Sequence, residues 1–418
     1  MRVYLWGIGK GFDKVIYSLN KDKVEILGII DNNPVLFHQF YKGYEVFSVD
    51  EIDAEYDYII ITIVQYKTLL YQLSKMGISD DKIICYYDLN VWNTQQSEMF
   101  SKELWKMDIL EQKIFELERR TDIRLKNIRY EIAADVTAQK YRFPIIKNRM
   151  CAVEQIVNER KSLIRFGDGE FEIMAGKNRP VFQKFDEKLS NRMRQVITTK
   201  DDRILLAIAN NYGNLDEYTE EVADGIREYM TEEVRKFHYS VLDFDKVYYD
   251  AYMFKCYYPY RDKDSTLERV QLVKQIWNKR NVVIVEGEET RSGVGNDLFD
   301  NTNSLKRILC PTQDAFSQYE EILKKAIKID KNNLVLIALG PAGKVLAYDL
   351  VQVGYQVVDV GQIDMDYEWY LAGQGIRVPI ANKYVSQLPP AVVEEVHDKV
   401  YKEQIICRIG EVEKQFDK

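Results

Sequence analysis

The feature that most constrains this chain is a repeated alternation between short apolar segments that end in glycine or aspartate and segments of helical periodicity. In the first part of the chain, strands are predicted at residues 2–9, 25–31, 56–63 and 82–87, and helices at 12–20 and 67–78. Strands and helices that alternate in this rhythm predict a parallel sheet with helices on both faces. We place a first domain of this kind at residues 1–92.

The same alternation returns on a larger scale from residue 141. Buried strands are predicted at residues 162–167, 203–209, 246–254, 281–287, 333–340 and 355–361, with a crossover helix at 343–354. The predicted fold class is therefore α/β, with two doubly wound Rossmann-like domains at 1–92 and 141–418. In such folds the ligand binds at the carboxyl ends of the strands.

Between these regions, residues 97–140 contain neither Gly nor Pro and predict a long helical linker, roughly 60 Å long if it is continuous. Side chains at steps of three, four or seven form a heptad-like stripe of Leu110, Ile114, Leu117, Thr121, Ile128 and Ile132. The helix either packs on its own domains or forms a coiled coil that joins two copies into a homodimer. Thr121 and Arg124 would make that coiled coil imperfect.

Composition excludes several classes of protein. A formal net charge of −8 argues against a nucleic-acid-binding protein with a broad basic surface. The five cysteines lack CxxC spacing and there are only three histidines, which argues against a disulfide framework or a zinc site. No transmembrane segment is expected, because no 18-residue uncharged apolar stretch occurs, and the N-terminus does not resemble a signal peptide. We expect a cytoplasmic protein, free or peripheral at the inner face of the membrane.

The first strand leads into "WGIGKGFDKV", which matches most of a dinucleotide-binding fingerprint. Gly7 and Gly9 lie between a strand and a helix, and Asp31 ends the next strand, where an acid would bind a ribose hydroxyl. Phe12 occupies the third glycine position, which departs from the pattern. The glycines either bind a nucleotide or only form the tight turn.

A second motif, "RFGDGE", follows the predicted strand at 162–167. Asp168 and Glu170, two residues apart in a turn with Arg165 and Gly167, could converge on one divalent metal ion that neutralises a diphosphate. The alternative is structural: Asp168 caps the next helix and Glu170 interacts with its dipole. Spacing alone leaves both interpretations open.

Three further loops follow predicted strands of the larger domain. They contribute Asn296 and Asp297 in "GVGNDLFDN", Gly340 and Gly343 in "ALGPAGK", and Gln362, Asp364 and Glu368 in "GQIDMDYEWYL". Because the carboxyl ends of parallel strands meet at one edge of a sheet, these loops predict a cleft lined with acids and backbone amides.

Taken in order, "RFGDGE", "GVGNDLFDN", "IALGPAG" with "AYDL", and "DYEWYL" ahead of "KYV" resemble the GT-D family of bacterial glycosyltransferases, over roughly residues 153–386. The resemblance implies a Rossmann-like fold and transfer of a sugar from a nucleotide-diphosphate donor, expected to be a UDP-sugar. It also implies a divalent metal, Mn²⁺ or Mg²⁺, with Asp168 and Glu170 as its ligands. The implied acceptor is a glycan, glycolipid or glycoprotein in bacterial surface polysaccharide or glycoprotein biosynthesis.

One residue departs from the expected family pattern. Gln362 stands where a histidine is expected, and glutamine cannot take up a proton at neutral pH. The role of general base would then move to Asp364 or Glu368. Arg165, Gly167, Asn296, Asp297, Gly340, Gly343 and Gln362 are the predicted donor-binding residues.

Two competing functions remain open at this point. The first is an NAD-dependent sugar-modifying enzyme that uses Gly7, Gly9 and Asp31 of the first domain. The second is a non-catalytic scaffold that assembles a glycosylation complex through the helix at 97–140.

Overall fold

The computed structural model describes residues 1–53, 55–64, 66–88, 94–136, 142–178, 182–373, 377–385 and 396–410. The chain divides into two compact units, Met1–Asp122 and Ile123–Lys418. The predicted domain limits at 92 and 140–141 lie outside the described residues, as does the end of the chain. Within the described residues, no helix is both long enough and apolar enough to cross a membrane.

The first unit is built on a six-stranded sheet of order β3-β4-β2-β1-β5-β6. Its strands are β1 (Arg2–Trp6), β2 (Glu25–Ile30), β3 (Phe40–Tyr41), β4 (Tyr44–Phe47), β5 (Tyr58–Ile61) and β6 (Ile83–Cys85). All neighbouring strands are parallel except β3 and β4. The sequence analysis missed this short β3–β4 pair, because two-residue and four-residue strands give too few positions for a period-2 pattern.

The helices of the first unit are α1 (Lys10–Ser18), α2 (Lys67–Lys75), α3 (Thr94–Met99) and the first part of α4 (Lys102–Val136). Trp105 and Ile109 of α4 are buried in the core formed by β1, α1 and β5. The indole of Trp105 also donates to the Tyr86 carbonyl at 2.7 Å. The beginning of α4 is therefore part of this unit. The predicted helix at 97–140 is wrong at its start, because α3 ends at Met99 and α4 begins at Lys102 as a continuous helix of 35 residues.

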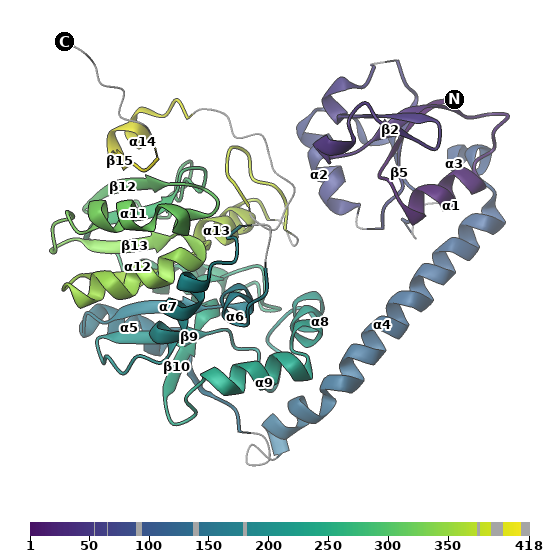
Figure 1. Ribbon diagram of the computed structural model, residues 1–418. Helices are drawn as coiled ribbons and strands as arrows, with labels where there is room; N and C mark the ends of the chain where they lie inside the picture. The colour runs from purple at the N-terminus through teal and green to yellow at the C-terminus, as the bar shows by residue number, and fades with distance from the viewer. Residues whose placement is uncertain are drawn as a thin grey trace, which may run out of the picture. The chain divides into compact units, whose positions relative to one another are not determined.

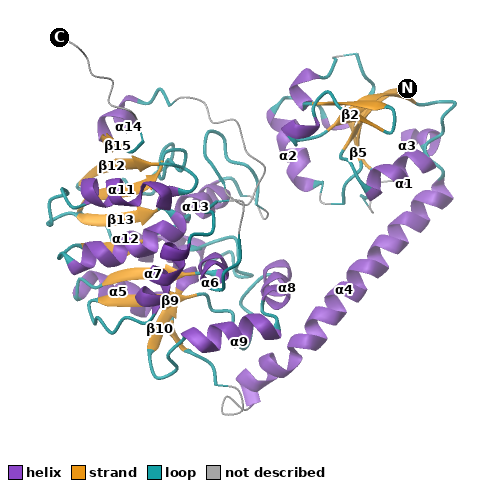
Figure 2. Ribbon diagram, in the orientation of Figure 1, coloured by secondary structure: helices purple, strands orange, loops and turns teal. Residues whose placement is uncertain are grey.

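The second unit contains a nine-stranded sheet of order β15-β12-β11-β13-β14-β8-β9-β10-β7, in which every neighbouring pair is parallel (Figures 1 and 2). Its strands are β7 (Ile145–Lys147), β8 (Ser162–Phe166), β9 (Ile204–Ile208), β10 (Val247–Asp250), β11 (Asn281–Gly287), β12 (Ser304–Cys310), β13 (Leu334–Ala338), β14 (Gln356–Asp359) and β15 (Ile405–Arg408). The structure is therefore of mixed α/β class with parallel sheets.

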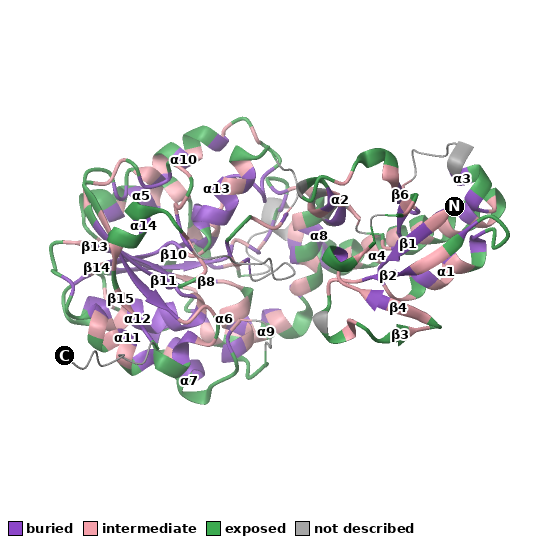
Figure 3. Ribbon diagram, turned by 90° about the horizontal axis from the view of Figure 1, so that it is seen from above, coloured by how far each residue is buried: buried purple, intermediate pink, exposed green. Residues whose placement is uncertain are grey.

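Helices cover both faces of this sheet, and its central strands are buried (Figure 3). One face packs against α6 (Asp168–Met174), α7 (Glu187–Ile197), α11 (Tyr319–Ala326) and α12 (Gly340–Gln352). The other packs against α5 (Arg149–Asn158), α10 (Thr266–Lys274) and α13 (Ile363–Leu371). Further α-helices among the described residues of the unit are α8 (Glu220–Tyr229), α9 (Glu232–Val241), α14 (Lys399–Gln404) and the end of α4.

The order of the strands reverses at β8, which lies between β14 and β9 in the sheet. β9 and β10 follow on one side, whereas β14 pairs with it on the other. This reversal creates a crevice at the carboxyl edge of β8 and β14, where ligands bind in open parallel sheets. The fold thus places the "RFGDGE" turn at the edge where a site is expected.

Candidate functional site

The β8–α6 turn brings the two predicted carboxylates to the edge of the sheet. Gly167 is the N-cap of α6, and its N–H donates to Oε2 of Glu170 at 2.9 Å. Asp168 is the first residue of the helix. The expectation that Asp168 caps the helix is therefore wrong, since the capping contact comes from Glu170, and both Asp168 and Glu170 line a cleft at this edge.

Arg165 and Asp359 join the ends of neighbouring strands beneath this turn. The Arg165 guanidinium donates from Nε to the Asp359 carbonyl at 2.7 Å and from Nη1 to the Ala251 carbonyl at 2.8 Å. Its Nη2 lies 3.4 Å from Oδ1 of Asp359. Arg165 therefore connects the ends of β8, β10 and β14 and fixes the floor of the cleft.

Lys344 on α12 connects that floor to Glu170. Its Nζ donates to Oδ2 of buried Asp359 at 2.7 Å and lies 3.5 Å from Oε1 of Glu170. Burial alone would raise the pKa of Asp359, but the charges of Lys344 and Arg165 outweigh it and hold that pKa below its usual value. Asp359 therefore stays ionised and orients both cations.

The cleft has a volume of about 880 Å³, within the size range of sites that bind small molecules and cofactors. It is lined from several strand ends and from α8. The lining includes the predicted residues Arg165, Gly167, Asp168, Glu170, Gly340 and Gln362, and the unpredicted residues Asn211, Glu221, Tyr229, Tyr252, Lys255, Lys344 and Arg377. Six of the predicted residues thus come together at one site.

Two of the unpredicted residues are cations that face the cleft. The ammonium of Lys255 lies over the Tyr252 ring, 4.6 Å from its centroid, and the Arg377 guanidinium lies 4.5 Å from the centroid of Tyr258. Within the part of the chain that the structure describes, neither forms a close ion pair with a carboxylate, and Asp168 and Asp366 offset the positive surroundings of Lys255 only in part. Burial, assisted by the charge of Arg377, lowers the pKa of Lys255 to about 8. An anion in the cleft would supply the missing counter-charge.

Glycine is required at the β13–α12 turn. Gly340 has φ +54°, and a Cβ there would lie 2.0 Å from the ring of Phe182. Gly343 does not line the cleft. It allows α12 to approach β13, since a Cβ would lie 2.7 Å from Ile337. Of these two predicted residues, Gly340 is at the site and Gly343 supports the packing behind it.

The predicted base candidates lie outside the cleft lining. Both oxygens of Asp364 are occupied: Oδ2 by Lys383 Nζ at 2.7 Å, and Oδ1 by the Gly293 N–H and Asn296 Nδ2, both at 2.8 Å. Glu368 Oε1 accepts from Lys383 and from Asn296, both at 2.7 Å. These contacts hold the "GVGND" loop against α13, so the geometry gives no support to proton abstraction by Asp364 or Glu368, nor to donor contact by Asn296.

Two neighbouring acids are also engaged within the protein. Asp297 pairs with Lys274 at 3.2 Å and accepts from the Tyr367 hydroxyl at 2.5 Å, away from the cleft. The carboxylate of Asp366 accepts three consecutive backbone N–H groups, from residues 256 to 258. Asp366 thereby shapes the loop that carries Lys255.

In the first unit, the predicted fingerprint residues lie at adjacent strand ends. Gly7 (φ +109°) and Gly9 (φ +130°) form the turn between β1 and α1. Asp31 follows β2, and its Oδ1 accepts the N–H of Asn33 at 2.9 Å, as in a turn. The structure therefore places these residues at one edge of the sheet, with the glycines serving the tight turn.

The cleft offers the implied metal a small set of carboxylate donors. No group of three or more His, Cys, Asp or Glu side chains among the described residues is arranged to hold a metal ion. Asp168 and Glu170 nevertheless line the same cleft. Two carboxylates fit an ion such as Mg²⁺, which commonly takes its other ligands from substrate phosphates and water.

The sequence analysis did not identify Lys344, Lys255, Arg377 or Asp359. Lys344 directly follows "GPAG", and Asp359 is the acid within the predicted strand at 355–361, so both positions carried a signal in the sequence. Lys255 and Arg377 lie in irregular segments without a periodic pattern. Only the tertiary fold shows that they face the same cleft.

Comparison with known proteins gives matches for both parts of the chain. Residues 163–388, more than half of the chain, match the family profile "Glycosyltransferase GT-D fold". Residues 1–84 match the profile "C2185-like, N-terminal".

Two curated relatives are similar over 62% of this chain. They are the "Glycosyltransferase GlyD" of Streptococcus pneumoniae serotype 4, 35% identical over 259 residues, and the "Probable glycosyl transferase Gly" of Streptococcus gordonii, 31% identical over 267 residues. The chain spans only about a third of their length, since the match covers 31% and 38% of them, respectively.

Solved structures of single domains match more completely. One, described as domain of unknown function 1792 with a distinct glycosyltransferase fold, is 34% identical with a TM-score of 0.61 and covers 64% of this chain and 96% of its own. Another, described as a new glycosyltransferase (DUF1792) from Streptococcus sanguinis, is 30% identical with a TM-score of 0.61 and covers 64% of this chain and 100% of its own. With the GT-D profile matching more than half of its residues, the chain belongs to the GT-D glycosyltransferase family.

Proposed function

We propose that this protein transfers a sugar from a nucleoside-diphosphate sugar to a hydroxyl group of a glycan acceptor. One observation carries the proposal: Asp168 and Glu170 share a cleft of about 880 Å³ with the cations Lys255, Lys344 and Arg377. Cations and carboxylates around one cavity suit a diphosphate that is bound partly by side chains and partly through a metal ion.

In this proposal the diphosphate lies between Lys255, Arg377 and the first turn of α12. The positive charges stabilise the negative charge that develops on the leaving nucleoside diphosphate as the sugar–oxygen bond breaks. The N-terminus of α12 adds backbone N–H donors to the same place. A divalent ion, Mn²⁺ or Mg²⁺, held by Asp168 and Glu170 would supply further charge neutralisation.

The acceptor hydroxyl needs a group that can take its proton. Besides Asp168 and Glu170, the carboxylate that lines the described part of the cleft is Glu221 on α8. The Tyr258 hydroxyl donates to its Oε1 at 3.3 Å, which orients it. We assign the role of base to Glu221 rather than to Asp364 or Glu368, because those two acids are bound to Lys383.

The finer assignments follow from the family resemblance. We propose a UDP-sugar as the donor and a surface polysaccharide, glycolipid or glycoprotein as the acceptor. The reaction would take place in the cytoplasm or at the inner face of the membrane. We further propose that residues 1–92 form a Rossmann-like domain that the helix at 97–140 links to the transferase domain at 141–418.

The first experiment measures the thermal stability of the full chain with nucleoside diphosphates and nucleotide sugars, with and without Mn²⁺. A ligand present at a hundred times its dissociation constant stabilises the folded state by about 2.7 kcal/mol. We expect a Mn²⁺-dependent shift with UDP or a UDP-sugar that Asp168→Asn abolishes. The matched control is Glu187→Gln, at the first position of α7 and away from the cleft lining.

Two results would contradict the proposal. A metal-independent shift with NAD alone, lost on substitution of Gly9 or Asp31, would favour a redox enzyme that uses the first unit. The absence of any shift, together with no sugar transfer, would favour a scaffold.

A further inference from the structure

Helix α4 presents an apolar row to solvent on the first unit. Met107, Leu110, Ile114 and Leu117 are 65%, 57%, 56% and 67% exposed, respectively. Trp105 and Ile109, on the opposite face, are buried in the core of the unit. One face of the helix therefore packs in the core of the first unit, and the apolar row on the other face has no partner among the described residues of that unit.

This row has the spacing of a coiled-coil seam. Met107 and Ile114 occupy a positions and Leu110 and Leu117 occupy d positions of two consecutive heptads. Beside the row lies a groove of about 640 Å³ between α1 and α4, walled by Tyr17 of α1. A second helix would have room to pack along the row.

The charges that flank the seam identify the partner. Lys106 and Lys113 occupy g positions, whereas Glu111 and Glu118 occupy e positions, and all four are exposed. Glu111 also accepts from Lys14 Nζ of α1 at 2.8 Å, so the charge argument depends mainly on Lys113 and Glu118. In a parallel pair of identical helices, each g residue faces the e residue five positions later in the other copy, so Lys106 meets Glu111 and Lys113 meets Glu118. In an antiparallel pair, lysine would face lysine and glutamate would face glutamate.

We propose that two copies of this chain associate through residues 106–121 of α4 as a parallel two-stranded coiled coil. The four seam residues expose on the order of 500 Å² of side-chain surface per copy, or about 1,000 Å² in a dimer, which reaches the lower end for a specific interface. The helix is already formed and anchored, so association orders little additional chain. A dissociation constant in the micromolar range is expected.

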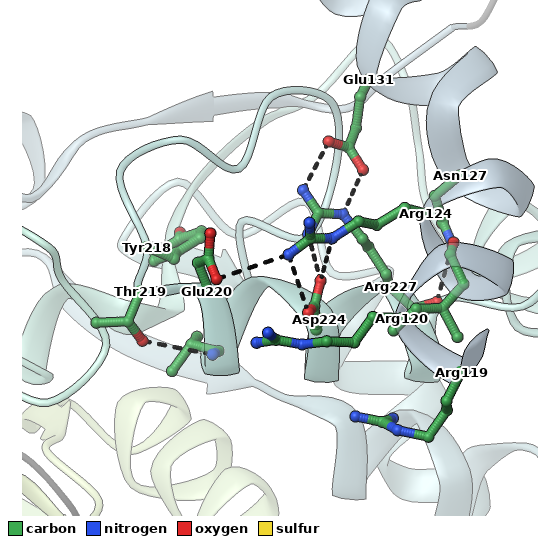
Figure 4. Close-up of polar contacts among 12 residues, drawn as sticks. Arg119, Arg120, Arg124, Asn127, Glu131, Tyr218, Thr219, Glu220, Asp224 and Arg227 are labelled. Atoms are coloured by element: carbon green, nitrogen blue, oxygen red, sulfur yellow. Dashed lines mark hydrogen bonds and ion pairs between the residues drawn. The ribbon is translucent and has the colours of Figure 1, made fainter. Parts of the chain in front are cut away.

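The structure also shows why the seam ends near Thr121. Arg124, at the next d position, donates from Nε to Oδ1 of Asp224 on α8 at 3.1 Å (Figure 4). Glu131, at the following d position, accepts hydrogen bonds from Nε and Nη2 of Arg227, at 2.7 and 2.9 Å. Beyond Thr121 the d positions are thus bound to the second unit's own helix and are not available to another copy.

The first test measures the mass of the full chain by sedimentation velocity from about 1 to 100 µM. We expect a concentration-dependent dimer whose dissociation constant rises at least tenfold in Leu110→Gln/Leu117→Gln. The matched control is Phe115→Gln, which removes a similarly exposed apolar side chain at a b position outside the seam. A monomer at every concentration, or an equal effect of Phe115→Gln, would overturn the proposal.

The second test is a charge exchange that reports orientation. In the parallel dimer, Lys113→Glu and Glu118→Lys each place like charges opposite one another and weaken association, whereas the double variant restores it. An antiparallel dimer would not be weakened by Lys113→Glu, and that result would overturn the parallel arrangement. Circular dichroism on each variant checks that the exposed helix stays folded.

Discussion

The ammonium group of Lys344 donates a hydrogen bond to the buried carboxylate of Asp359 at 2.7 Å. This contact joins α12 to the end of β14 at the cleft. Both side chains are almost fully buried. The same ammonium lies 3.5 Å from Glu170. One ion pair therefore supports both the packing of the sheet edge and the position of a proposed metal ligand.

Lys344→Met is expected to destabilise the protein by about 3–5 kcal/mol, because Asp359 would remain as a buried charge without its main partner. Denaturant unfolding measures this loss. The double variant Lys344→Met/Asp359→Asn should recover much of the stability, since both charges are removed, but not sugar transfer. If the double variant were no more stable than the single one, burial of Asp359 would not be the cause.

Asp168→Asn should lower kcat for sugar transfer by about a hundredfold or more, because it removes one of the two carboxylates proposed to hold the divalent metal ion. The effect on folding should stay within about 1 kcal/mol, since Asp168 contributes to α6 mainly through the helix dipole. Steady-state kinetics and thermal unfolding measure the two effects. Glu187→Gln should leave kcat unchanged, and equal losses in the two variants would point to a general effect of charge.

Glu221→Gln tests the acceptor side of the cleft. If Glu221 takes the acceptor proton, kcat should fall by about 10²–10⁴-fold while the affinity for UDP stays the same. Kinetics with saturating donor and calorimetric titration with UDP separate the two effects. Asp364→Asn, in contrast, should act through stability, because Asp364 is bound to Lys383. A normal kcat in Glu221→Gln would remove it from the mechanism.

The pKa of Lys255 predicts how donor binding depends on pH. Burial and Arg377 lower this pKa to about 8, against the opposing effect of Asp168 and Asp366. A bound diphosphate favours the charged ammonium and raises the pKa, so binding takes up a proton. Affinity for UDP should therefore fall as pH rises through about 8, by up to tenfold per pH unit.

Calorimetric titration with UDP at constant saturating Mg²⁺, from pH 7 to 9.5, measures this dependence. Lys255→Gln should bind UDP weakly and with little pH dependence. Lys255→Arg should also show little pH dependence, but it should bind UDP more tightly than Lys255→Gln does. A wild-type affinity that is constant over this range would show that Lys255 does not contact the diphosphate.

The sequence predicted the strands of the larger sheet best where they are buried and end in glycine. Residues 281–287 and 355–361 are two such cases, because burial on both faces produces continuous apolar runs. β12 was missed, because Lys306 and Arg307 interrupt its apolar pattern. Arg307 is in fact buried and paired with Glu286, a contact between strands that the sequence of one strand cannot show.

For the site, the sequence correctly placed the "RFGDGE" and "GPAG" turns at one edge, since parallel strand ends must meet there. It could not show which acids face the cleft. Asp364 and Asp366 follow a strand just as Asp168 does, yet they turn toward Lys383 and toward three backbone amides. Side-chain direction on a short helix depends on packing that spans more than a hundred residues of sequence.

His238 makes the stability of the second unit sensitive to acid. Its ring is buried and stacked on Phe171, with the Tyr212 hydroxyl 2.7 Å from Nδ1 and the Tyr229 hydroxyl 3.1 Å from Nε2. Burial, and secondarily Arg235, lowers the pKa of His238 from 6.5 to about 4. Between about pH 6.5 and pH 4 the unfolded chain therefore binds a proton that the folded chain does not.

The free energy of unfolding should be unaffected by His238 above pH 6.5 and should fall by about 3 kcal/mol between pH 6.5 and 4. Denaturant unfolding across this range measures the loss. His238→Gln can still form hydrogen bonds with both tyrosines but cannot be protonated, so its stability should fall less steeply with acid, even if it is lower at pH 7. If the two proteins lost stability in parallel, carboxylates elsewhere would account for the acid sensitivity. Because Tyr229 also lines the cleft, a flatter profile in His238→Gln would locate the acid-sensitive step beside the proposed active site.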